Sequence, residues 1–481
     1  MLSNKKMFSR FVLSLFLILC AGLIASAQQP WTLQQCIDQA LKYNIQIKQS
    51  SLSNDLNKVQ VTQNTASMFP SINAGANQNY YFGRSIDPYT NQFTTNQVSS
   101  NNFSLSGNLT IFEGLQLQNN LKESKLSYLS SQNDLKKIQN DISINVVNYY
   151  LQVLFNGDLM KISLDQMNAS GIQRDRMKRM YDLGSVNKGN FLDLESQYST
   201  DELKYIQAQS QYTQALLSLT QLLELDTIKN FSIAKPEVII PGFDSTQLQV
   251  ERIYLTALKT QPDVKSSEYK TLSAEKRLSS AKGALYPRIY LNGALSTNYS
   301  TSSKNITYIE NPPIQTISGF TSAGDIVYSY IPDRTAIIRD TPFKDQFDNN
   351  LAKSVGITLQ VPVFNGWAAR SNISRSRINL EQSRLNNDLT KKNIFKSVQQ
   401  AVTDASSSYK KFIAGQRSVD ALNETYNYNQ KRLDLGLINT YDYLITKNNL
   451  ANAQASLLQA KYDYIFRMKI LDFYQGKPLT F

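Results

Sequence analysis

Asp182-Leu183-Gly184-Ser185-Val186-Asn187, running on to Phe191-Leu192, is the stretch that decides the fold, because the chain repeats it. The second copy is Asp434-Leu435-Gly436-Leu437-Ile438-Asn439, running on to Tyr443-Leu444, at an offset of 252 residues. Two long copies indicate two similar structural units, whereas a solenoid would show many short ones.

Other landmarks keep the same order in both copies. Phe112-x-Gly114 matches Phe364-x-Gly366, again at an offset of 252, and Phe69-Pro70 matches Tyr286-Pro287 at an offset of 217. The second copy therefore carries 35 extra residues between these two landmarks. We predict repeat 1 over 28–234, a linker over 235–250 and repeat 2 over 251–481.

The first 27 residues have the pattern of a signal peptide. Lys5, Lys6 and Arg10 precede a short apolar run that ends at Ala25-Ser26-Ala27, a small-x-small cleavage site. We expect removal after Ala27. A competing possibility is lipidation at Cys20, but the preceding Leu19 is bulky where a small residue is needed.

Composition excludes several classes of chemistry. The chain has no histidine, which removes the commonest general base and the commonest metal ligand. After cleavage one cysteine, Cys36, remains, so no internal disulfide can form. The net charge of +12 falls to about +9 without the three signal-peptide charges, and we assign it to a solvated surface. We expect no cofactor, no metal and no nucleic acid partner.

Long proline-free stretches predict very long helices. No proline lies between Pro88 and Pro236 or between Pro362 and Pro478, and a proline inside a helix costs about 3 kcal/mol or more. From Leu194 the seam residues follow a 4-3 alternation through Tyr198, Asp201 and Tyr205, which is typical of a coiled coil. We predict long helices over about 115–226 and 367–474, the first rising ~100 Å to its tip.

Alternating sequence precedes each Phe-x-Gly and predicts strands. We expect strand hairpins over about 70–112 and 287–364, the second with a long polar loop over 300–350. On one face, apolar side chains would contact lipid while the alternating polar ones line water. These lipid-facing candidates are Phe103, Leu105, Leu109, Ile111, Val355, Ile357, Leu359 and Val361. A soluble sheet packed on helices is the alternative explanation.

A lipid environment requires the edges of the predicted sheet to be paired. An open sheet edge in hydrocarbon leaves backbone groups unpaired, at several kcal/mol each. Four strands cannot close by themselves, whereas three chains would supply a 12-stranded barrel, an allowed even number. The predicted fold is thus a mixed α/β membrane protein: long α-helices in a coiled-coil tunnel, with four antiparallel strands per chain contributing to a trimeric barrel.

The paired landmarks resemble the TolC-like outer membrane channel family over essentially the whole mature chain, including the tail Phe473-Tyr474-Gln475-Gly476. The resemblance implies a homotrimer in outer membrane lipid with its helical tunnel in the periplasm. It implies an exit duct of a tripartite efflux or type I secretion system, with a periplasmic adaptor and an inner-membrane pump or ABC exporter as partners. The exported substrate stays undefined.

The same resemblance nominates site residues. Acidic residues after the second tip turn narrow the entrance in known members; the first position corresponds to Asp442, but the second is Ile445. Asp193 is the acidic residue of the first copy. A helix N-terminal carboxylate explains Asp442 equally well. The adaptor-contacting tip turns would comprise Leu183, Gly184, Asn187, Leu435, Gly436 and Asn439.

Two other classes of function were weighed. A secreted or surface trimeric coiled-coil protein would explain the heptads and the signal peptide, but not the strands that precede each Phe-x-Gly. An enzyme would need catalytic groups, and the chain offers no histidine, glycine-rich phosphate loop or paired cysteines. We therefore expect a channel and not an enzyme.

Overall fold

The computed structural model describes residues 30–86, 91–94, 97–226, 231–237, 240, 242–244 and 248–480. The predicted signal peptide and Cys20 lie outside these residues. By their contacts, the chain forms two compact units. Unit 1 runs to Asn57 and includes Leu126–Thr271 and Gln382–Phe481, and unit 2 comprises Lys58–Lys125 and Leu272–Glu381.

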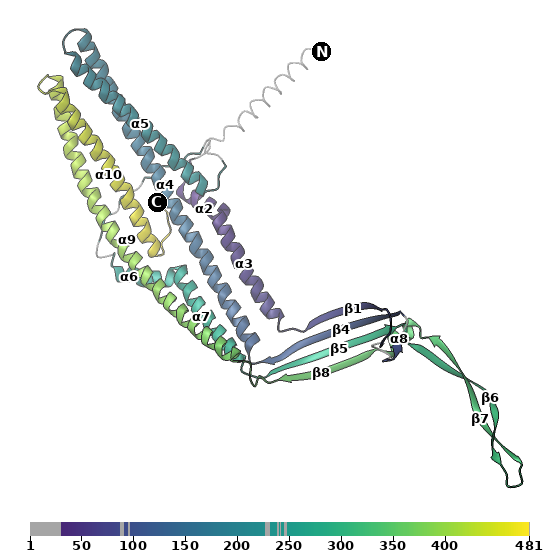
Figure 1. Ribbon diagram of the computed structural model, residues 1–481. Coiled ribbons are helices and arrows are strands. Elements are labelled where there is room, and N and C mark those ends of the chain that lie inside the picture. Colours follow the sequence, from purple (N-terminus) through teal and green to yellow (C-terminus); the bar gives the residue numbers. More distant parts are fainter. Residues whose placement is uncertain are drawn as a thin grey trace, which may run out of the picture. The chain divides into compact units, whose positions relative to one another are not determined.

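Helices dominate, as predicted, and Figure 1 labels them along the chain. The helices are α2 (Leu33–Tyr43), α3 (Ile45–Ala66), α4 (Gln116–Asp182), α5 (Lys188–Leu222), α6 (Val250–Thr260), α7 (Pro262–Gly283), α8 (Phe343–Asn349), α9 (Ala368–Asp434) and α10 (Thr440–Tyr474). The strands are β1 (Ser71–Tyr81), β2 (Ser85–Ile86), β3 (Phe93–Thr94), β4 (Val98–Glu113), β5 (Arg288–Ser300), β6 (Lys304–Phe320), β7 (Ile326–Asp340) and β8 (Ala352–Gln360).

The duplication is visible at the C-terminal ends of the short helices α2 and α6. Helix α2 ends at Asn44, whose N–H donates to Ala40 O at 2.9 Å, and α6 ends at Gln261, whose N–H donates to Ala257 O at 2.8 Å. Both terminal residues have extended ψ, 130° and 127°, so the chain turns before α3 and α7 begin. Pro262 opens α7, a position where its missing N–H costs nothing. The 217-residue offset thus holds in three dimensions.

Both tip turns close in the same way. Gly184 and Gly436 have φ of +73° and +70°, the left-handed conformation that glycine adopts without a steric penalty. Ser185 N–H donates to Met180 O, and Leu437 N–H donates to Arg432 O, so each helix ends in a Schellman motif. Glycine at the two equivalent positions thus lets both long helices end in the same turn.

The two Phe-x-Gly landmarks mark strand-to-helix junctions. Gly114 and Leu115 both have positive φ, +59° and +61°, and so do Gly366 and Trp367, +62° and +68°. Two consecutive left-handed residues reverse the chain direction sharply between a strand and a long helix. A side chain on Gly114 would lie 2.2 Å from the carbonyl oxygen of Gly283, so this close approach also requires glycine.

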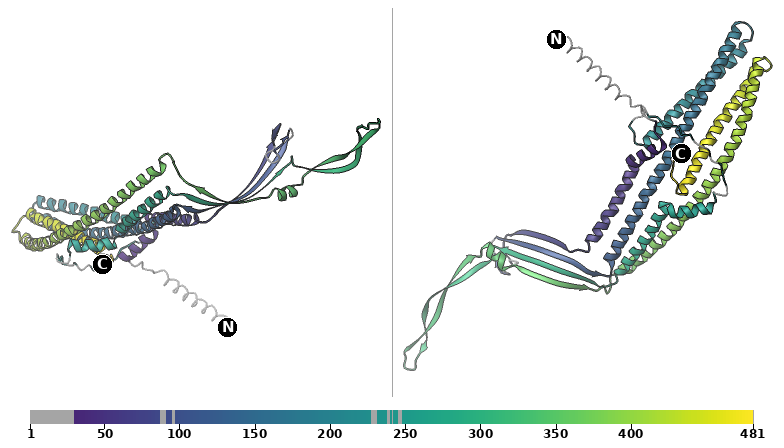
Figure 2. Two further views of the ribbon diagram at one scale, coloured as in Figure 1. Left: turned by 90° about the horizontal axis from the view of Figure 1, so that it is seen from below. Right: turned by 180° about the vertical axis from the view of Figure 1, so that it is seen from behind.

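Four strands form one antiparallel sheet in the order β1-β4-β5-β8. Its central pair joins the repeats, since β4 comes from repeat 1 and β5 from repeat 2. Figure 2 shows the four strands as a single layer. The expected four strands per chain are confirmed.

The segment predicted as a long loop over 300–350 contains regular structure, so that part of the prediction is wrong. Strands β6 and β7 form a separate two-stranded sheet, and α8 follows. Pro312 and Pro313 lie at a register shift between Asn311 and Ile314, where a strand does not need their missing N–H groups.

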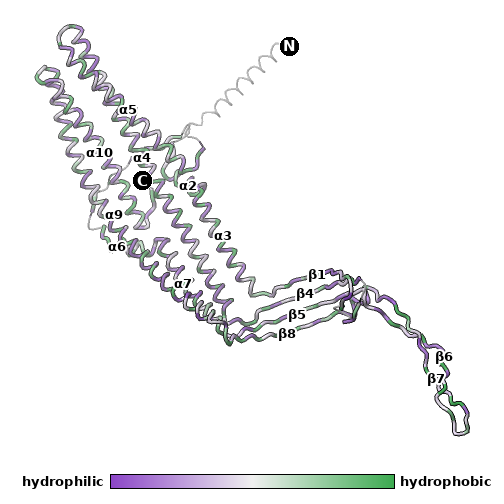
Figure 3. The backbone as a smooth tube through the Cα atoms, in the orientation of Figure 1, coloured by the Kyte–Doolittle hydropathy of each residue, from purple (hydrophilic) through white to green (hydrophobic). Residues whose placement is uncertain are grey.

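Unit 1 contains two apolar cores. In the first, α2 packs with α4 and α5 around Val146, Tyr150 and Leu219, and α10 contributes Leu458, Tyr462 and Ile465; in the second, α6 packs with α9 and α10 around Ala257, Val398 and Leu471. Figure 3 shows hydrophobic and hydrophilic residues intermixed along the long helices, as narrow seams require. Among the described residues, no helix combines the length and apolar character needed to cross a membrane.

Candidate functional site: sheet faces, helix tips and a buried ion pair

The strand register separates side chains of the four-stranded sheet into two chemically distinct faces, since successive residues point to opposite sides. The apolar face carries Ile72, Ala74, Ala76, Phe103, Leu105, Leu109, Ile289, Leu291, Leu295, Val355, Ile357 and Leu359. The polar face carries Asn73, Asn77, Ser104, Ser106, Asn108, Thr110, Asn292, Ser296, Ser354, Thr358 and Gln360. The polar face is thus lined mainly with neutral hydrogen-bonding groups, and near the helix junctions it also carries the ion pair between Arg288 and Glu113 at 3.5 Å.

Most predicted lipid-facing residues lie together on the apolar face. On β8, Val355, Ile357 and Leu359 are 83%, 72% and 63% exposed. A soluble sheet would bury such residues against a second layer, whereas these side chains of β8 remain exposed. The exposure therefore favours a membrane-facing wall.

Three of these residues have a more specific setting. Ile111 lies at a register shift in β4, so Phe112 and not Ile111 pairs with Ile289. Phe103 is partly covered, because its ring lies 6.3 Å from that of Phe343 and 6.0 Å from that of Phe347. Val361 follows the last residue of β8 and is exposed.

The predicted tip residues lie on exposed turns. Leu183 and Leu435 are 81% and 73% exposed, although leucine is a residue that folding normally buries. Asn187 and Asn439 cap the returning helices: their side-chain oxygens accept the N–H groups of Asn190 and Asp442 at 2.9 and 2.8 Å. Each tip thus combines a rigid turn with an exposed apolar side chain.

Asp442 and Asp193 are both exposed near the starts of α10 and α5. Asp442 lies in the first turn of its helix, where the helix dipole favours a negative charge. No described residue forms an ion pair with either carboxylate. Both are therefore free to meet water, cations or another copy of the chain.

A buried polar cluster near the tips was not predicted from the sequence. Lys447 Nζ lies 2.6 Å from Asp201 Oδ2, and the two side chains are only 8% and 2% exposed. Ser170 accepts a hydrogen bond from Lys447 and donates one to Asp201, while Gln197 donates to Asp201 at 2.9 Å. Burial lowers the pKa of Lys447, and its hydrogen bond to Asp201 opposes this shift.

This cluster joins the two repeats, since Ser170 and Asp201 belong to α4 and α5 and Lys447 to α10. The sequence did contain a signal. Asp201 occupies a seam position of the 4-3 alternation, where an apolar residue is expected. Lys447 follows Leu444 by three residues and precedes Ala451 by four, the same spacing.

The chain combines duplicated helical hairpins with a sheet that has one apolar and one polar face. This combination is typical of a membrane channel with a helical extension. The model of the outer membrane efflux protein family matches residues 36–224 and 253–471, and the chain belongs to this family. The chain is thus an outer membrane efflux channel whose helical tunnel lies in the periplasm. The predicted family and location are confirmed.

Curated relatives span most of the chain. It is 21% identical over 462 residues to the outer membrane protein TolC of Escherichia coli, covering 92% of this chain and 81% of TolC. It is also 21% identical over 395 residues to the outer membrane efflux protein BepC of Brucella suis, covering 80% and 73%. Sequence divergence is therefore large, although the similarity extends over most of the chain.

Solved structures share the fold. The Campylobacter jejuni CmeC outer membrane channel matches with a TM-score of 0.73 at 18% identity, covering 92% of this chain and 85% of that one. The open state of the Neisseria gonorrhoeae MtrE outer membrane channel matches with a TM-score of 0.71 at 15% identity, covering 93% and 89%. At these identities the likeness defines the fold alone.

Proposed function

We propose that three copies of the chain close one 12-stranded barrel and form the passive exit duct of a tripartite efflux or type I secretion system. The observation that carries this proposal is the sheet itself. Its outer strands, β1 and β8, each have a neighbour on one side only. In hydrocarbon an unpaired edge is prohibitively costly, so a second copy must complete the pairing.

The contact between the repeats supplies a template for the contact between copies. Strands β4 and β5 pair Asn108 with Asn292. Applying the repeat offsets to this pair gives Gln360 on β8 opposite Gly75 of the partner subunit, and Thr358 opposite Asn77 of the partner subunit. Both pairs lie on the polar face, so the polar lining would continue across the joint.

Helix faces in unit 1 support the same head-to-tail arrangement. Within the chain, α4 contacts α7 through Ser130 and Ser266, whose hydroxyl oxygens lie 2.9 Å apart. The equivalent surfaces belong to α9 and α3, and there large apolar side chains are exposed. These are Leu385 and Leu389 on α9, and Leu52 and Leu56 on α3. Burying them against each other would add hydrophobic stabilisation to each joint.

A disulfide test addresses closure directly. The variant Thr358→Cys/Asn77→Cys should form intermolecular disulfides on mild oxidation and give a covalent trimer in denaturing gels, because cross-strand cysteines meet the distance requirement. The control pair Thr358→Cys/Ser71→Cys is displaced by six residues, about 20 Å along the strand, and should stay monomeric. Equal cross-linking in both variants, or none in either, would contradict the register.

We further propose that the duct is gated and docked at its tips and performs no catalysis. Asp442, with Asp193, would line the periplasmic entrance, where three converging carboxylates attract cations. Leu183, Gly184, Asn187, Leu435, Gly436 and Asn439 would form the contact with the periplasmic adaptor, which in turn binds the pump or ABC exporter.

The gate and the docking surface need separate tests. In planar bilayers, Asp442→Asn should reduce cation selectivity and block by multivalent cations, whereas unchanged values would argue against a carboxylate ring.

Leu435→Asp should weaken cross-linking to the adaptor without reducing the trimer fraction. Intact cross-linking would exclude this tip from the adaptor contact.

A further inference from the structure

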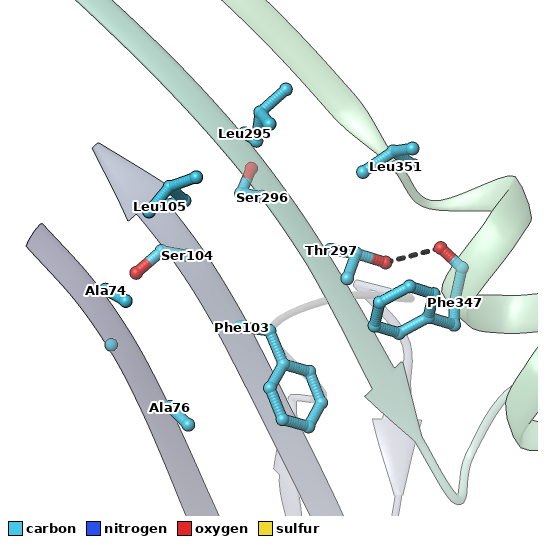
Figure 4. Close-up of a pocket in the computed structure, with 11 residues that line it drawn as sticks. Ala74, Ala76, Phe103, Ser104, Leu105, Leu295, Ser296, Thr297, Phe347 and Leu351 are labelled. Carbon is cyan, nitrogen blue, oxygen red and sulfur yellow. Dashed lines mark hydrogen bonds between the residues drawn. The ribbon is translucent and has the colours of Figure 1, made fainter. Parts of the chain in front are cut away.

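A preformed groove lies on the apolar face of the four-stranded sheet, beside α8. It encloses about 490 Å³ and is lined by Ala74, Ala76, Phe103, Leu105, Leu295, Phe347 and Leu351. Figure 4 shows the alanines of β1 at one side of the groove and Phe347 and Leu351 at the other. These side chains are apolar, and Ser104, Ser296 and Thr297 also contribute to the lining.

The groove exists because small residues adjoin large ones. Ala74 pairs with Leu105 and Ala76 with Phe103, so β1 forms a low floor beside the bulky side chains of β4. Helix α8 forms a fixed wall: Thr297 Oγ1 donates to Phe347 O at 2.7 Å. The buried Gln346 also accepts from Ser300 N and donates to Ser300 O, both at 3.0 Å. A ligand would therefore find the groove already formed.

One positively charged side chain lies on this apolar surface. Lys353 lies on the same face, directly opposite Leu295 in the register, and it is the one charged residue on the apolar face of the four described strands. It is exposed, and no described residue forms an ion pair with it. A lysine on a lipid-facing strand is tolerated near the headgroups but not at the midplane. Lys353 therefore marks the headgroup level beside the groove.

We propose that this groove binds a phosphate-bearing membrane lipid, with an acyl chain along Ala74 and Ala76 and the phosphate beside Lys353. The inference rests on the proposed barrel, which places the apolar face in the membrane. The strand ends near α8 are those remote from the helix junctions at Gly114 and Gly366. Because the helices extend into the periplasm, the lipid belongs to the outer leaflet.

Native mass spectrometry of the purified full-length protein can test the site with two matched probes. Phosphatidic acid carries the phosphate, and diacylglycerol with the same chains lacks it. The wild-type trimer should retain phosphatidic acid in preference to diacylglycerol. Lys353→Gln should lower that preference about five-fold, the effect of one basic residue near an anionic surface. Ala74→Leu, which fills the groove, should reduce retention of both lipids.

Controls separate the possible failures. Arg334→Gln removes one positive charge from the exposed hairpin and should leave lipid retention unchanged. If Ala74→Leu prevents trimer formation, Leu351→Trp fills the groove from outside the strands. Equal retention of the two lipids by the wild-type trimer, or an unchanged preference in Lys353→Gln, would overturn the lipid site and leave the channel intact. A monomer that needs no detergent would instead overturn the proposed function.

Discussion

The two tip hairpins, α4–α5 and α9–α10, have identical lengths and different interiors. Helices α4 and α9 both have 67 residues, and α5 and α10 both have 35. Their Schellman turns and asparagine caps coincide at the 252-residue offset. In contrast, the position equivalent to Asp201 is Ala453, and the position equivalent to Lys447 is Glu195.

This difference shows that the backbone turns and the interface side chains of the two repeats were constrained differently. Backbone features such as caps and turns stayed the same because both hairpins must have the same length and direction. Interface side chains could diverge, because in the proposed ring each hairpin has a neighbour in its own chain on one side and a different copy on the other. The ion pair between Lys447 and Asp201 belongs only to the contact within the chain.

The largest expected effect comes from breaking that ion pair. Lys447→Met leaves the carboxylate of Asp201 buried without its partner, which should destabilise the protein by about 3–5 kcal/mol. Chemical denaturation followed by helical circular dichroism measures the loss. The double variant Lys447→Met/Asp201→Leu should recover most of it, because an apolar pair needs no charge compensation.

A matched lysine provides the control for this prediction. Lys204 also lies near Asp201, at 3.7 Å, but its side chain is 43% exposed. Lys204→Met should therefore cost at most about 1 kcal/mol. If both lysine variants lose the same stability, burial is not what makes the Lys447 contact important.

The next largest loss of stability is expected at the strand-to-helix junctions, where the two repeats should respond differently to the same substitution. Gly114→Ala adds a methyl group 2.2 Å from the carbonyl oxygen of Gly283, whereas nothing lies within 4 Å of the equivalent position at Gly366. Both substitutions carry the left-handed penalty of about 1–2 kcal/mol. Gly114→Ala should therefore lose more stability than Gly366→Ala, measured as the yield of folded protein after refolding.

Equal losses of stability in Gly114→Ala and Gly366→Ala would indicate that Gly366 also has a close neighbour in the assembled protein. The repeat offsets place Ala66 of the partner subunit beside Gly366 in a closed ring, as Gly283 lies beside Gly114. A penalty for Gly366→Ala that is small in the monomer and large in the trimer would support that closure.

Sequence patterns predicted the parts of the fold that depend on local backbone requirements. Gly184 and Gly436 were assignable because few other residues tolerate positive φ, and strands such as β8 because alternation of Val355, Ile357 and Leu359 has one structural meaning. The strands β6 and β7 escaped prediction because paired prolines resemble a break. The seam positions of Asp201 and Lys447 were a signal of a buried polar contact but did not identify the pairing, and the groove beside α8 gave no signal, since each feature depends on residues that are distant in the sequence.

A smaller effect is expected at the helix caps, where the two hairpins should behave alike. Asn187→Ala and Asn439→Ala each remove one side-chain acceptor from a helix N-terminus, at a cost of about 1 kcal/mol. Hydrogen exchange at the first turns of α5 and α10 should accelerate by a similar factor in each variant. A response at one cap only would show that the tips differ in their surroundings despite identical turns.

The smallest effect concerns a position at which the repeats differ without consequence for packing. Cys36 stands where repeat 2 has Ile253, and both are buried, with 0% and 2% exposure. Burial raises the pKa of the Cys36 thiol to about 12. Because the thiolate is the reactive form, alkylating reagents at pH 8 should leave Cys36 unmodified in the folded protein and modify it fully in denaturant. Peptide mapping by mass spectrometry distinguishes these states, and rapid labelling of the folded protein would mean that the core around Cys36 opens.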